Sequence, residues 1–303
     1  MPVTDAPPGF TAYEAIRHRL PAPIRRGECR FAQHLGEIAE HYDTLLLDAF
    51  GVLNRGPEAI AGVPERIAAL QARGKRVMVV SNAAGVPQRA LMARYRALGY
   101  RFDSADVITS RKTLSHALEE SRPRHWGMIV GPDFGPEEFP PLDYRLLGDE
   151  RADYDAVEGF LLIGVSEWTP TRQALLVESL RQSARPLLVG NPDLLAPQPN
   201  GYSREPGSVA HAIHDETGHE PVFHGKPYDN IFARVRARLA ADGEINPQRT
   251  LMVGDTLHTD ILGGQVAGLQ TALVTQTGVL AGMDVERAIE ASGIAPDWIL
   301  ERP

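Results

Sequence analysis

Cysteine is almost absent from this sequence, and lysine is scarce. The single cysteine, Cys29, excludes an internal disulfide and any metal site built from several cysteines. Such sparing use of cysteine is typical of proteins in a reducing compartment. The chain contains only three lysines, Lys75, Lys112 and Lys226, among many arginines. Because lysines are so few, each one is more informative than usual about the role of its position.

Blocks of basic residues and long apolar runs are also missing. The formal net charge of −8 argues against binding to nucleic acid. The longest apolar run, GFLLIGV at residues 159–165, is too short to cross a bilayer. The first residues, MPVTDAPPGF, include no apolar segment of the kind found in secretory signals. We therefore expect a cytoplasmic protein that binds neither membranes nor nucleic acid.

Short apolar stretches alternate with helical patterns along most of the 303 residues. The stretches predicted as strands are 44–48, 76–80, 127–130, 159–165, 186–189, 250–254 and 271–274. Helices are predicted between them, one beginning near Pro64 and another after Pro227. This alternation indicates parallel sheets connected by right-handed crossovers. Residues 1–42 are different: we expect an N-terminal extension with one amphipathic helix at 31–41, and we assign it no chemistry.

Three of the predicted strands end in polar residues. TLLLD ends in Asp48, VMVVSNAAG leads into Ser81 and Asn82, and TLMVGDTLHTD contains Asp255 and Asp260. The carboxyl ends of parallel strands meet at one edge of a sheet, where open α/β folds bind their ligands. Several carboxylates in one crevice are tolerated when a hard divalent cation lies among them, and Mg²⁺ suits such oxygen donors. The sequence therefore predicts a magnesium site at this edge.

Lys226, in the segment HGKPYDN, completes the group of candidate residues. It follows an apolar pair at 222–223 and precedes a predicted helix. A lysine there could neutralise an anionic intermediate and orient a nucleophile. Each of these residues taken alone would more often be a helix cap or a turn residue. Together and in this order they indicate an active site.

The order and spacing of these motifs resembles the haloacid dehalogenase superfamily of phosphotransferases. Asp48 matches the nucleophile of that superfamily, Ser81 its second motif, Lys226 its third, and GDTLHTD its fourth. The large-cap (type IIA) subfamily includes nitrophenylphosphatases and the N-acetylglucosamine-operon nucleotidase. Four further segments resemble it: ITSRKTL at 108–114, VGNPDLLAPQPNGY at 189–202, TGHEPVFHGKPYDNIF at 217–232 and TGV at 277–279. The resemblance covers roughly residues 42 to 300.

The resemblance implies an α/β fold with two parts. A Rossmann-like parallel-sheet core domain would comprise residues 43–90 and 221–303. A large α/β cap domain, residues 91–220, would be inserted into it and would determine substrate specificity. Two chains could also pair through their caps to form a homodimer.

The resemblance also implies a phosphatase that acts on a small phosphorylated molecule. Asp48 would attack phosphorus and form an aspartyl-phosphate, which water would then hydrolyse. The residues implied as magnesium ligands are Asp48, the backbone carbonyl of Phe50, Asp255 and Asp260. Those implied in phosphate binding are Ser81, Asn82 and Lys226, the last also with a catalytic role. In the cap, Asn191 and Asp193 would contact the rest of the substrate.

Phe50 departs from the pattern of the family. The phosphatases of the superfamily have a second aspartate two residues after the nucleophile, which protonates the leaving oxygen and then activates water. A phenylalanine can do neither, and general acid–base catalysis is typically worth about 10²–10⁴-fold. Without a replacement, rates should fall steeply as the pKa of the leaving group rises.

The sequence leaves several explanations of Phe50 open. The substrate could have a good leaving group, or a cap residue could supply the proton; the candidates are Asp193, Tyr202, His211 and His214. The reaction could instead cleave a carbon–phosphorus bond with Lys112 as a Schiff-base lysine, or a carbon–halogen bond, although GDTLHTD argues against the metal-free dehalogenases. Alternatively, the chain could bind phosphate compounds without turnover.

Overall fold

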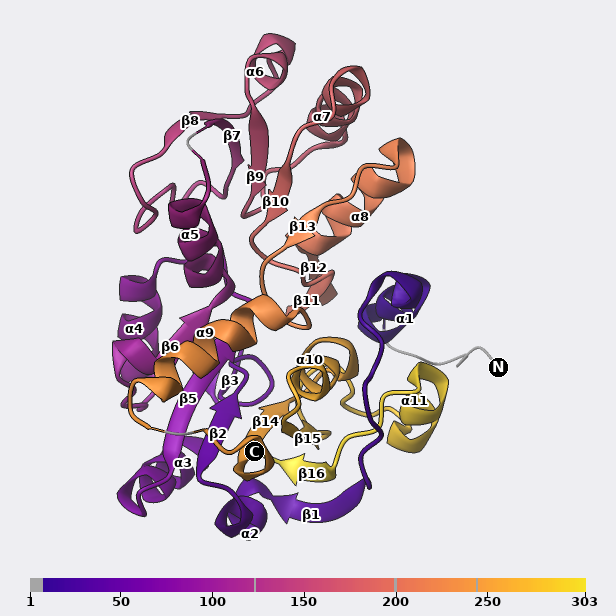
Figure 1. The fold of residues 1–303 in the computed structure, drawn as a ribbon. Coiled ribbons are helices and arrows are strands. Elements are labelled where there is room, and N and C mark those ends of the chain that lie inside the picture. Colours follow the sequence, from indigo (N-terminus) through magenta and orange to yellow (C-terminus); the bar gives the residue numbers. More distant parts are fainter. Residues whose placement is uncertain (1–7, 123, 199–200, 244) are drawn as a thin grey trace.

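The computed structural model describes residues 8–122, 124–198, 201–243 and 245–303. Two parallel sheets with helices on both faces lie one above the other in Figure 1. The core sheet has the strand order β1-β16-β15-β14-β2-β5-β6, and the cap sheet has the order β13-β10-β9-β7-β8. Adjacent strands are parallel in both sheets. The α/β fold with a Rossmann-like core and a second α/β unit is confirmed.

All seven strands predicted from the sequence are present. The core strands are β1 (Arg30–His34), β2 (Thr44–Leu47), β5 (Arg76–Ser81), β6 (Val107–Thr109), β14 (Thr250–Gly254), β15 (Gln270–Val274) and β16 (Trp298–Arg302). The cap strands are β7 (His125–Ile129), β8 (Asp143–Leu146), β9 (Gly159–Leu162), β10 (Leu187–Val189) and β13 (Val222–Phe223). Two antiparallel hairpins are formed by β3 (Asn54–Arg55) with β4 (Glu58–Ala59) and by β11 (Leu195–Gln198) with β12 (Gly201–Arg204).

The longer helices are α1 (Pro8–Ala15), α3 (Val63–Ala72), α4 (Gln88–Ala97), α5 (Ser110–Glu120), α7 (Pro170–Gln182), α8 (Pro206–Thr217), α9 (Asp229–Ala240) and α11 (Val285–Ser292). The shorter helical turns are η1 (Arg17–Arg19), α2 (Leu35–Ile38), η2 (Ala39–His41), η3 (Ser104–Asp106), α6 (Arg151–Asp155), η4 (Pro247–Arg249), η5 (Leu257–Ile261) and α10 (Leu262–Val266). Among the described residues, no helix is long and apolar enough to cross a membrane.

Alternating side chains along the core strands separate two apolar layers. Leu45 and Leu47 of β2 belong to a cluster that includes residues of α3 and α4. Leu46, between them, belongs to a cluster on the other face with residues of α9. Successive side chains of a strand point to opposite faces, and both faces of a parallel sheet are covered. This explains why the strand that leads to Asp48 is apolar at every position.

The cap sheet is covered in the same way. Phe160 and Leu162 of β9 pack with residues of α6, α7 and α8 on one face. Leu161 packs on the other face with Leu114 and Leu118 of α5. The cap therefore has its own apolar core.

The N-terminal segment does not contain the amphipathic helix expected at 31–41. Residues 30–34 form β1, which pairs with β16 at the edge of the core sheet, and only the short turns α2 and η2 follow. Only Ala32 of this strand is buried, and Phe31 is 62% exposed. A short edge strand with a single buried side chain lacks the regular alternation of apolar and polar residues by which sequence analysis recognises a strand.

The two sheets also divide the chain at residues other than those expected. Strand β6, at 107–109, pairs with β5, so the core sheet extends beyond residue 90. Strand β13, at 222–223, pairs with β10 in the cap sheet, although 221–303 were assigned to the core. Strand β1 belongs to the core sheet although 1–42 were expected to be an extension. These differences arise from pairing between distant strands, which local patterns do not encode.

Candidate active site

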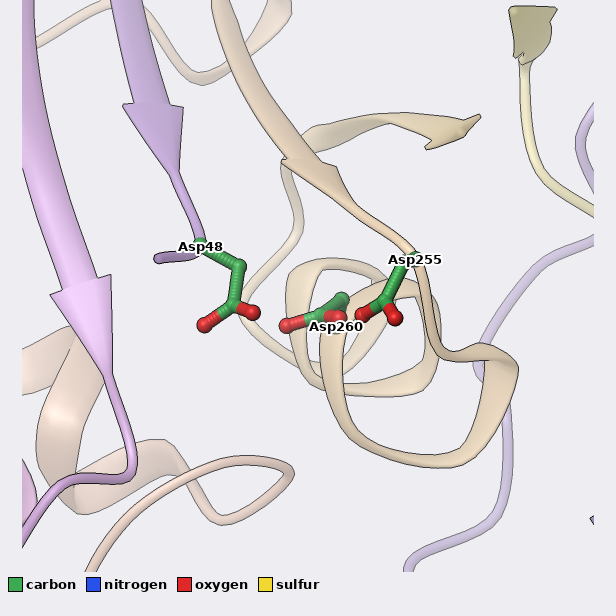
Figure 2. A group of neighbouring side chains, drawn as sticks. All are labelled: Asp48, Asp255 and Asp260. Carbon is green, nitrogen blue, oxygen red and sulfur yellow. The ribbon is translucent and has the colours of Figure 1, made fainter. Parts of the chain in front are cut away.

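Two neighbouring strands in the middle of the core sheet end in aspartates (Figure 2). Strands β2 and β14 pair with Leu47 opposite Val253, and the N–H of Asp48 donates to the Val253 carbonyl at 2.9 Å. Asp255 follows β14 directly. Both carboxylates therefore emerge at the same edge of the sheet. The side chain of Asp48 is only 13% exposed, and Asp255 is almost completely buried.

Asp260 joins these two carboxylates through a π-helical turn. The N–H groups of Asp260 and Ile261 both donate to the carbonyl of Thr256, at 3.1 and 3.3 Å. The turn brings Oδ2 of Asp260 back to the N–H of Thr256 at 3.1 Å. Oxygen atoms of Asp48, Asp255 and Asp260 lie within 4.8 Å of one another. Such widened turns occur frequently at functional sites.

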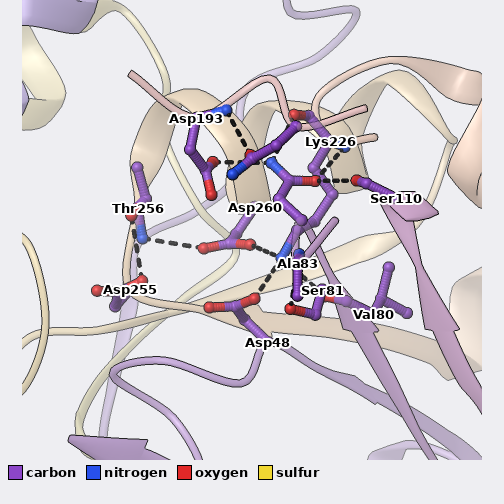
Figure 3. Close-up of polar contacts among 12 residues, drawn as sticks. Asp48, Val80, Ser81, Ala83, Ser110, Asp193, Lys226, Asp255, Thr256 and Asp260 are labelled. Atoms are coloured by element: carbon purple, nitrogen blue, oxygen red, sulfur yellow. Dashed lines mark hydrogen bonds and ion pairs between the residues drawn. The ribbon is translucent and has the colours of Figure 1, made fainter. Parts of the chain in front are cut away.

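Lys226 lies against this group of carboxylates and is 1% exposed (Figure 3). Its Nζ donates to Oδ1 of Asp48 at 2.5 Å, to Oδ1 of Asp260 at 2.7 Å and to the Val80 carbonyl at 2.7 Å. These contacts use all three hydrogens of the ammonium. Burial alone would lower the pKa of Lys226, but the adjacent carboxylates of Asp260 and Asp48 raise it above its ordinary value. The lysine is therefore a fixed positive charge.

One lysine does not balance three buried carboxylates. Burial raises the pKa of Asp255 well above its ordinary value, and the charges of Asp260 and Asp48 raise it further. Burial also raises the pKa of Asp260, with a contribution from Asp48, although Lys226 opposes the rise. Like charges in a poorly solvated site disfavour ionisation of each other. The group therefore has the electrostatic character of a site for a cation.

A glycine leaves the space that Asp255 occupies. A Cβ atom at Gly278 would lie 1.7 Å from Oδ2 of Asp255, and the φ of Gly278 is +83°, which favours glycine. The next residue, Val279, donates its N–H to the same Oδ2 at 2.8 Å. The segment TGV thus shapes the pocket of this carboxylate from a distant part of the chain.

Ser81 lies at the neighbouring strand end, beside Asp48 (Figure 3). It is 7% exposed, and its Oγ accepts a hydrogen bond from the N–H of Ala83 at 3.3 Å. A hydroxyl in this position retains its own hydrogen as a donor. Ser81 therefore lies at the same edge of the core sheet as Asp48.

Asn82 links Lys226 to the cap. Its Oδ1 accepts from the N–H of Lys226 at 2.7 Å and from Oγ of Ser110 at 3.1 Å. Its Nδ2 donates to the Lys226 carbonyl at 3.0 Å and to Oδ1 of Asp193 at 2.8 Å. Both amide hydrogens are therefore used within the protein. The structure gives this side chain a positioning role, which the sequence did not indicate.

The structure brings Asp193 to the site, whereas the side chain of Asn191 is bonded within the loop that carries Asp193. Oδ1 of Asn191 accepts from the N–H of Asp193 at 2.9 Å, and its Nδ2 donates to Glu205 at 3.2 Å. An asparagine that bonds the backbone two residues on stabilises a tight turn. Asn191 therefore shapes the loop from which Asp193 reaches Asn82.

Three other cap residues considered as proton donors are held elsewhere. His211 is buried and stacks on Phe223 with 5.0 Å between ring centroids, and burial lowers its pKa to about 4. Nδ1 of His214 lies 3.1 Å from the carbonyl of His219. Tyr202, on β12, is 37% exposed. Among the described contacts, none of these three side chains hydrogen-bonds to a residue of the carboxylate group.

Helix α1 also reaches the site, a contact that the sequence did not indicate. The hydroxyl of Tyr13 donates to Oδ1 of Asp193 at 3.3 Å, and its ring stacks on His258 at 5.2 Å between centroids. Tyr13 is 3% exposed. A lone tyrosine in a segment without a clear period offers no signal that sequence analysis could use.

Comparison with known proteins agrees with this geometry. The family profile for haloacid dehalogenase-like hydrolases matches residues 45–139, and a related profile matches residues 223–302. The glycerol-3-phosphate phosphatase of Gallus gallus is 31% identical over 87% of this chain and 90% of its own length. This chain belongs to the haloacid dehalogenase superfamily. Human chronophin is also 31% identical, over 88% of this chain and 93% of its own.

Solved structures place the chain within the superfamily more narrowly. A possible sugar phosphatase of the superfamily from Cytophaga hutchinsonii matches with a TM-score of 0.80 and 25% identity, covering 90% of this chain and 98% of its own. Together with the large second α/β unit, these relatives identify the chain as a hydrolase of the large-cap, type IIA phosphatases.

Substitution of Lys226, whose ammonium contacts Asp48, Asp260 and the Val80 carbonyl, should lower both stability and activity. In Lys226→Met, Asp48 and Asp260 keep their buried positions but lose their counter-charge, which should cost roughly 3–5 kcal/mol of unfolding free energy. Phosphatase activity should fall below detection. Lys112→Met is the control, because Lys112 is exposed and its Nζ lies 3.4 Å from the Ser104 carbonyl. Urea unfolding and turnover of p-nitrophenyl phosphate would measure both effects. Turnover close to the wild-type rate in Lys226→Met would contradict this role of the lysine.

Proposed function

We propose that this chain is a Mg²⁺-dependent phosphatase that acts on a small phosphorylated molecule through an aspartyl-phosphate on Asp48. The observation that carries the proposal is the convergence of Asp48, Asp255, Asp260 and Lys226 in one buried group at the edge of the core sheet. A nucleophile, a fixed positive charge and an oxygen-rich cation site are the parts that phosphoryl transfer requires.

The residues present suit Mg²⁺. The candidate ligands are all oxygens, and the three carboxylates exceed the charge of Lys226. Hard oxygen donors with few protein carboxylates are the usual environment of this ion. Asp48, Asp255 and the backbone carbonyl of Phe50 would hold the ion, with Asp260 beside them. When bound, the ion would reduce the repulsion between Asp48 and the incoming phosphate.

Lys226 holds the carboxylate of Asp48 in place through one oxygen. Nζ of Lys226 donates to Oδ1, and we assign the attack on phosphorus to Oδ2, which Lys226 does not contact. A bond forms between Oδ2 and phosphorus as the bond to the leaving oxygen breaks, and water later cleaves the aspartyl-phosphate. The hydroxyl of Ser81 and the backbone N–H groups after β5 are suited to hold phosphate oxygens. Asn82 would contact the phosphate through its backbone, because its side chain is engaged within the protein.

The substrate proposed is a phosphate ester of a small alcohol or sugar. Similar proteins are named glycerol-3-phosphate phosphatase and possible sugar phosphatase. Such esters have poor leaving groups, because an alkoxide is much more basic than a phenolate. The first explanation of Phe50, a good leaving group, therefore has less support than a replacement proton donor.

The nucleophile can be tested by an isosteric change. Asp48→Asn should remove turnover and leave the fold intact, because an amide cannot form the aspartyl-phosphate. Asp43→Asn is a matched control, since Asp43 lies just before the same strand and its side chain is 60% exposed beside Arg249. Steady-state rates and trapping of a phosphorylated chain would be measured. A variant at Asp48 that retained most activity would remove this mechanism.

The metal can be tested by binding as well as by activity. Titration calorimetry should detect Mg²⁺ binding to the wild type, and Asp255→Ala should weaken it at least tenfold, because it removes a buried ligand. Excess chelator should abolish turnover. Full activity in chelator would instead favour the metal-free dehalogenase branch, and metal binding without turnover would favour a binding protein.

Pairing of two chains through the cap is a further part of the proposal. Strand β8 forms one edge of the cap sheet, and its Tyr144 and Leu146 are 38% and 54% exposed. Unpaired strand edges with apolar side chains favour association. Light scattering should therefore give the mass of two chains, and Leu146→Glu should give one. A monomeric wild type at high concentration would discard the dimer without affecting the enzyme.

A further inference from the structure

The missing aspartate at Phe50 leaves a specific chemical need. An alkoxide departing from a phosphate ester requires a proton, and the turn that carries Phe50 offers no acid at that position. A replacement must be an acidic group that faces the crevice from another element. This inference rests on the proposed function and concerns which group meets that need.

Asp193 is the cap carboxylate that the structure brings to the group of Asp48, Asp260 and Lys226, to which Asn82 connects it. The described residues donate to it only at Oδ1, from Nδ2 of Asn82 at 2.8 Å and from the hydroxyl of Tyr13 at 3.3 Å. Oδ2 is left for a ligand. Figure 3 shows the carboxylate of Asp193 directed toward Asp260.

Asp193 is also connected rigidly to the nucleophile. The same Nδ2 of Asn82 that donates to Asp193 donates to the Lys226 carbonyl at 3.0 Å, and Nζ of Lys226 holds Asp48. One amide therefore fixes the cap carboxylate relative to the core carboxylate. Proton transfer depends on such positioning, because donor and acceptor must be within hydrogen-bond reach.

The surroundings of Asp193 raise its pKa above the ordinary value of a carboxyl group. Burial raises its pKa to about 6, although the hydrogen bond from Asn82 and the charge of Lys226 oppose the rise. The negative charges of Asp48 and Glu205 add to the increase. A carboxyl with a pKa close to the working pH can both donate and accept a proton.

The N-terminal helix supports this carboxyl from the other side. Burial raises the pKa of Tyr13 well above its ordinary value, so its hydroxyl stays protonated and donates to Asp193. The same hydroxyl oxygen accepts from the N–H of Leu194 at 3.4 Å. The ring stacks on His258, two residues before Asp260, so α1 fills the junction between the cap loop and the core (Figure 1).

We propose that Asp193 donates the proton to the leaving oxygen in place of the aspartate absent at Phe50, and that Tyr13 positions Asp193. As Oδ2 of Asp48 bonds to phosphorus, the bond to the ester oxygen breaks and its electron pair takes the proton of Asp193, which releases the alcohol. Asp193 is then a carboxylate. It takes a proton from the water that attacks phosphorus, so that inorganic phosphate leaves and Asp48 and Asp193 return to their initial states.

A series of aryl phosphates with leaving groups of different pKa tests the role of Asp193. The ratio kcat/KM reports steps up to departure of the leaving group. In the wild type it should depend weakly on leaving-group pKa, because the developing charge is neutralised. Asp193→Asn, which preserves shape and can still accept from Asn82 and Tyr13, should steepen the dependence and lower the rate for alkyl phosphates by about 10²-fold or more.

Rescue at the original position makes the test sharper. Phe50→Asp in the Asp193→Asn background should flatten the dependence again, because it restores an acid where the family has one. A steep dependence in the wild type, or an equal loss for all leaving groups in Asp193→Asn, would overturn the proposal. Both comparisons can be made only if the wild type shows Mg²⁺-dependent turnover. Absence of that turnover would reject the proposed function itself.

The positioning role of Tyr13 has a separate readout. Tyr13→Phe keeps the ring on His258 and removes the hydroxyl, so it should steepen the leaving-group dependence partly and leave KM nearly unchanged. Tyr202→Phe is the matched control, because Tyr202 is 37% exposed on β12 and none of the described hydrogen bonds joins its side chain to the carboxylate group. Urea unfolding would establish that each variant is folded. An unchanged dependence in Tyr13→Phe would remove this residue from the proposal while the test of Asp193 stands.

Discussion

The contact of Lys226 with Asp48 and Asp260 is the interaction on which the site depends. A buried ammonium is costly unless every hydrogen has a partner, and here two carboxylates and a strand carbonyl provide them. The lysine holds the carboxylate of the nucleophile in place through Oδ1. It also requires that the segment carrying Lys226 be held accurately against the strand ends of the core sheet.

Asn82 meets that requirement and joins the two halves of the molecule. Its amide binds the backbone of Lys226 at both the N–H and the carbonyl, and it binds Asp193 in the cap. The same side chain therefore aligns a core lysine and a cap carboxylate. In this arrangement the cap is more than a cover over the phosphate: it carries a group that can take part in the chemistry.

The N-terminal segment also joins the core to the cap. Its strand β1 completes the edge of the core sheet, and its helix α1 reaches the junction with the cap. An ion pair between Arg19 and Asp215 of the cap, and a hydrogen bond from Arg17 to the Ser292 carbonyl of the core, fix η1 to both parts. A segment without an apparent motif can thus act on a site by filling the space between two better-defined units.

The sequence by itself determined the α/β class and seven of the strands, four in the core sheet and three in the cap sheet. It also determined the order of Asp48, Ser81, Lys226, Asp255 and Asp260. Apolar periodicity and polar residues at strand ends are local signals. It also showed the departure at Phe50. Only the tertiary structure decided that Asp193 faces the crevice whereas His211 packs against Phe223, and that Tyr13 reaches Asp193. It likewise decided that β1 and β6 belong to the core sheet. These outcomes depend on contacts between residues far apart in the chain, and their energies are absent from any short window of sequence.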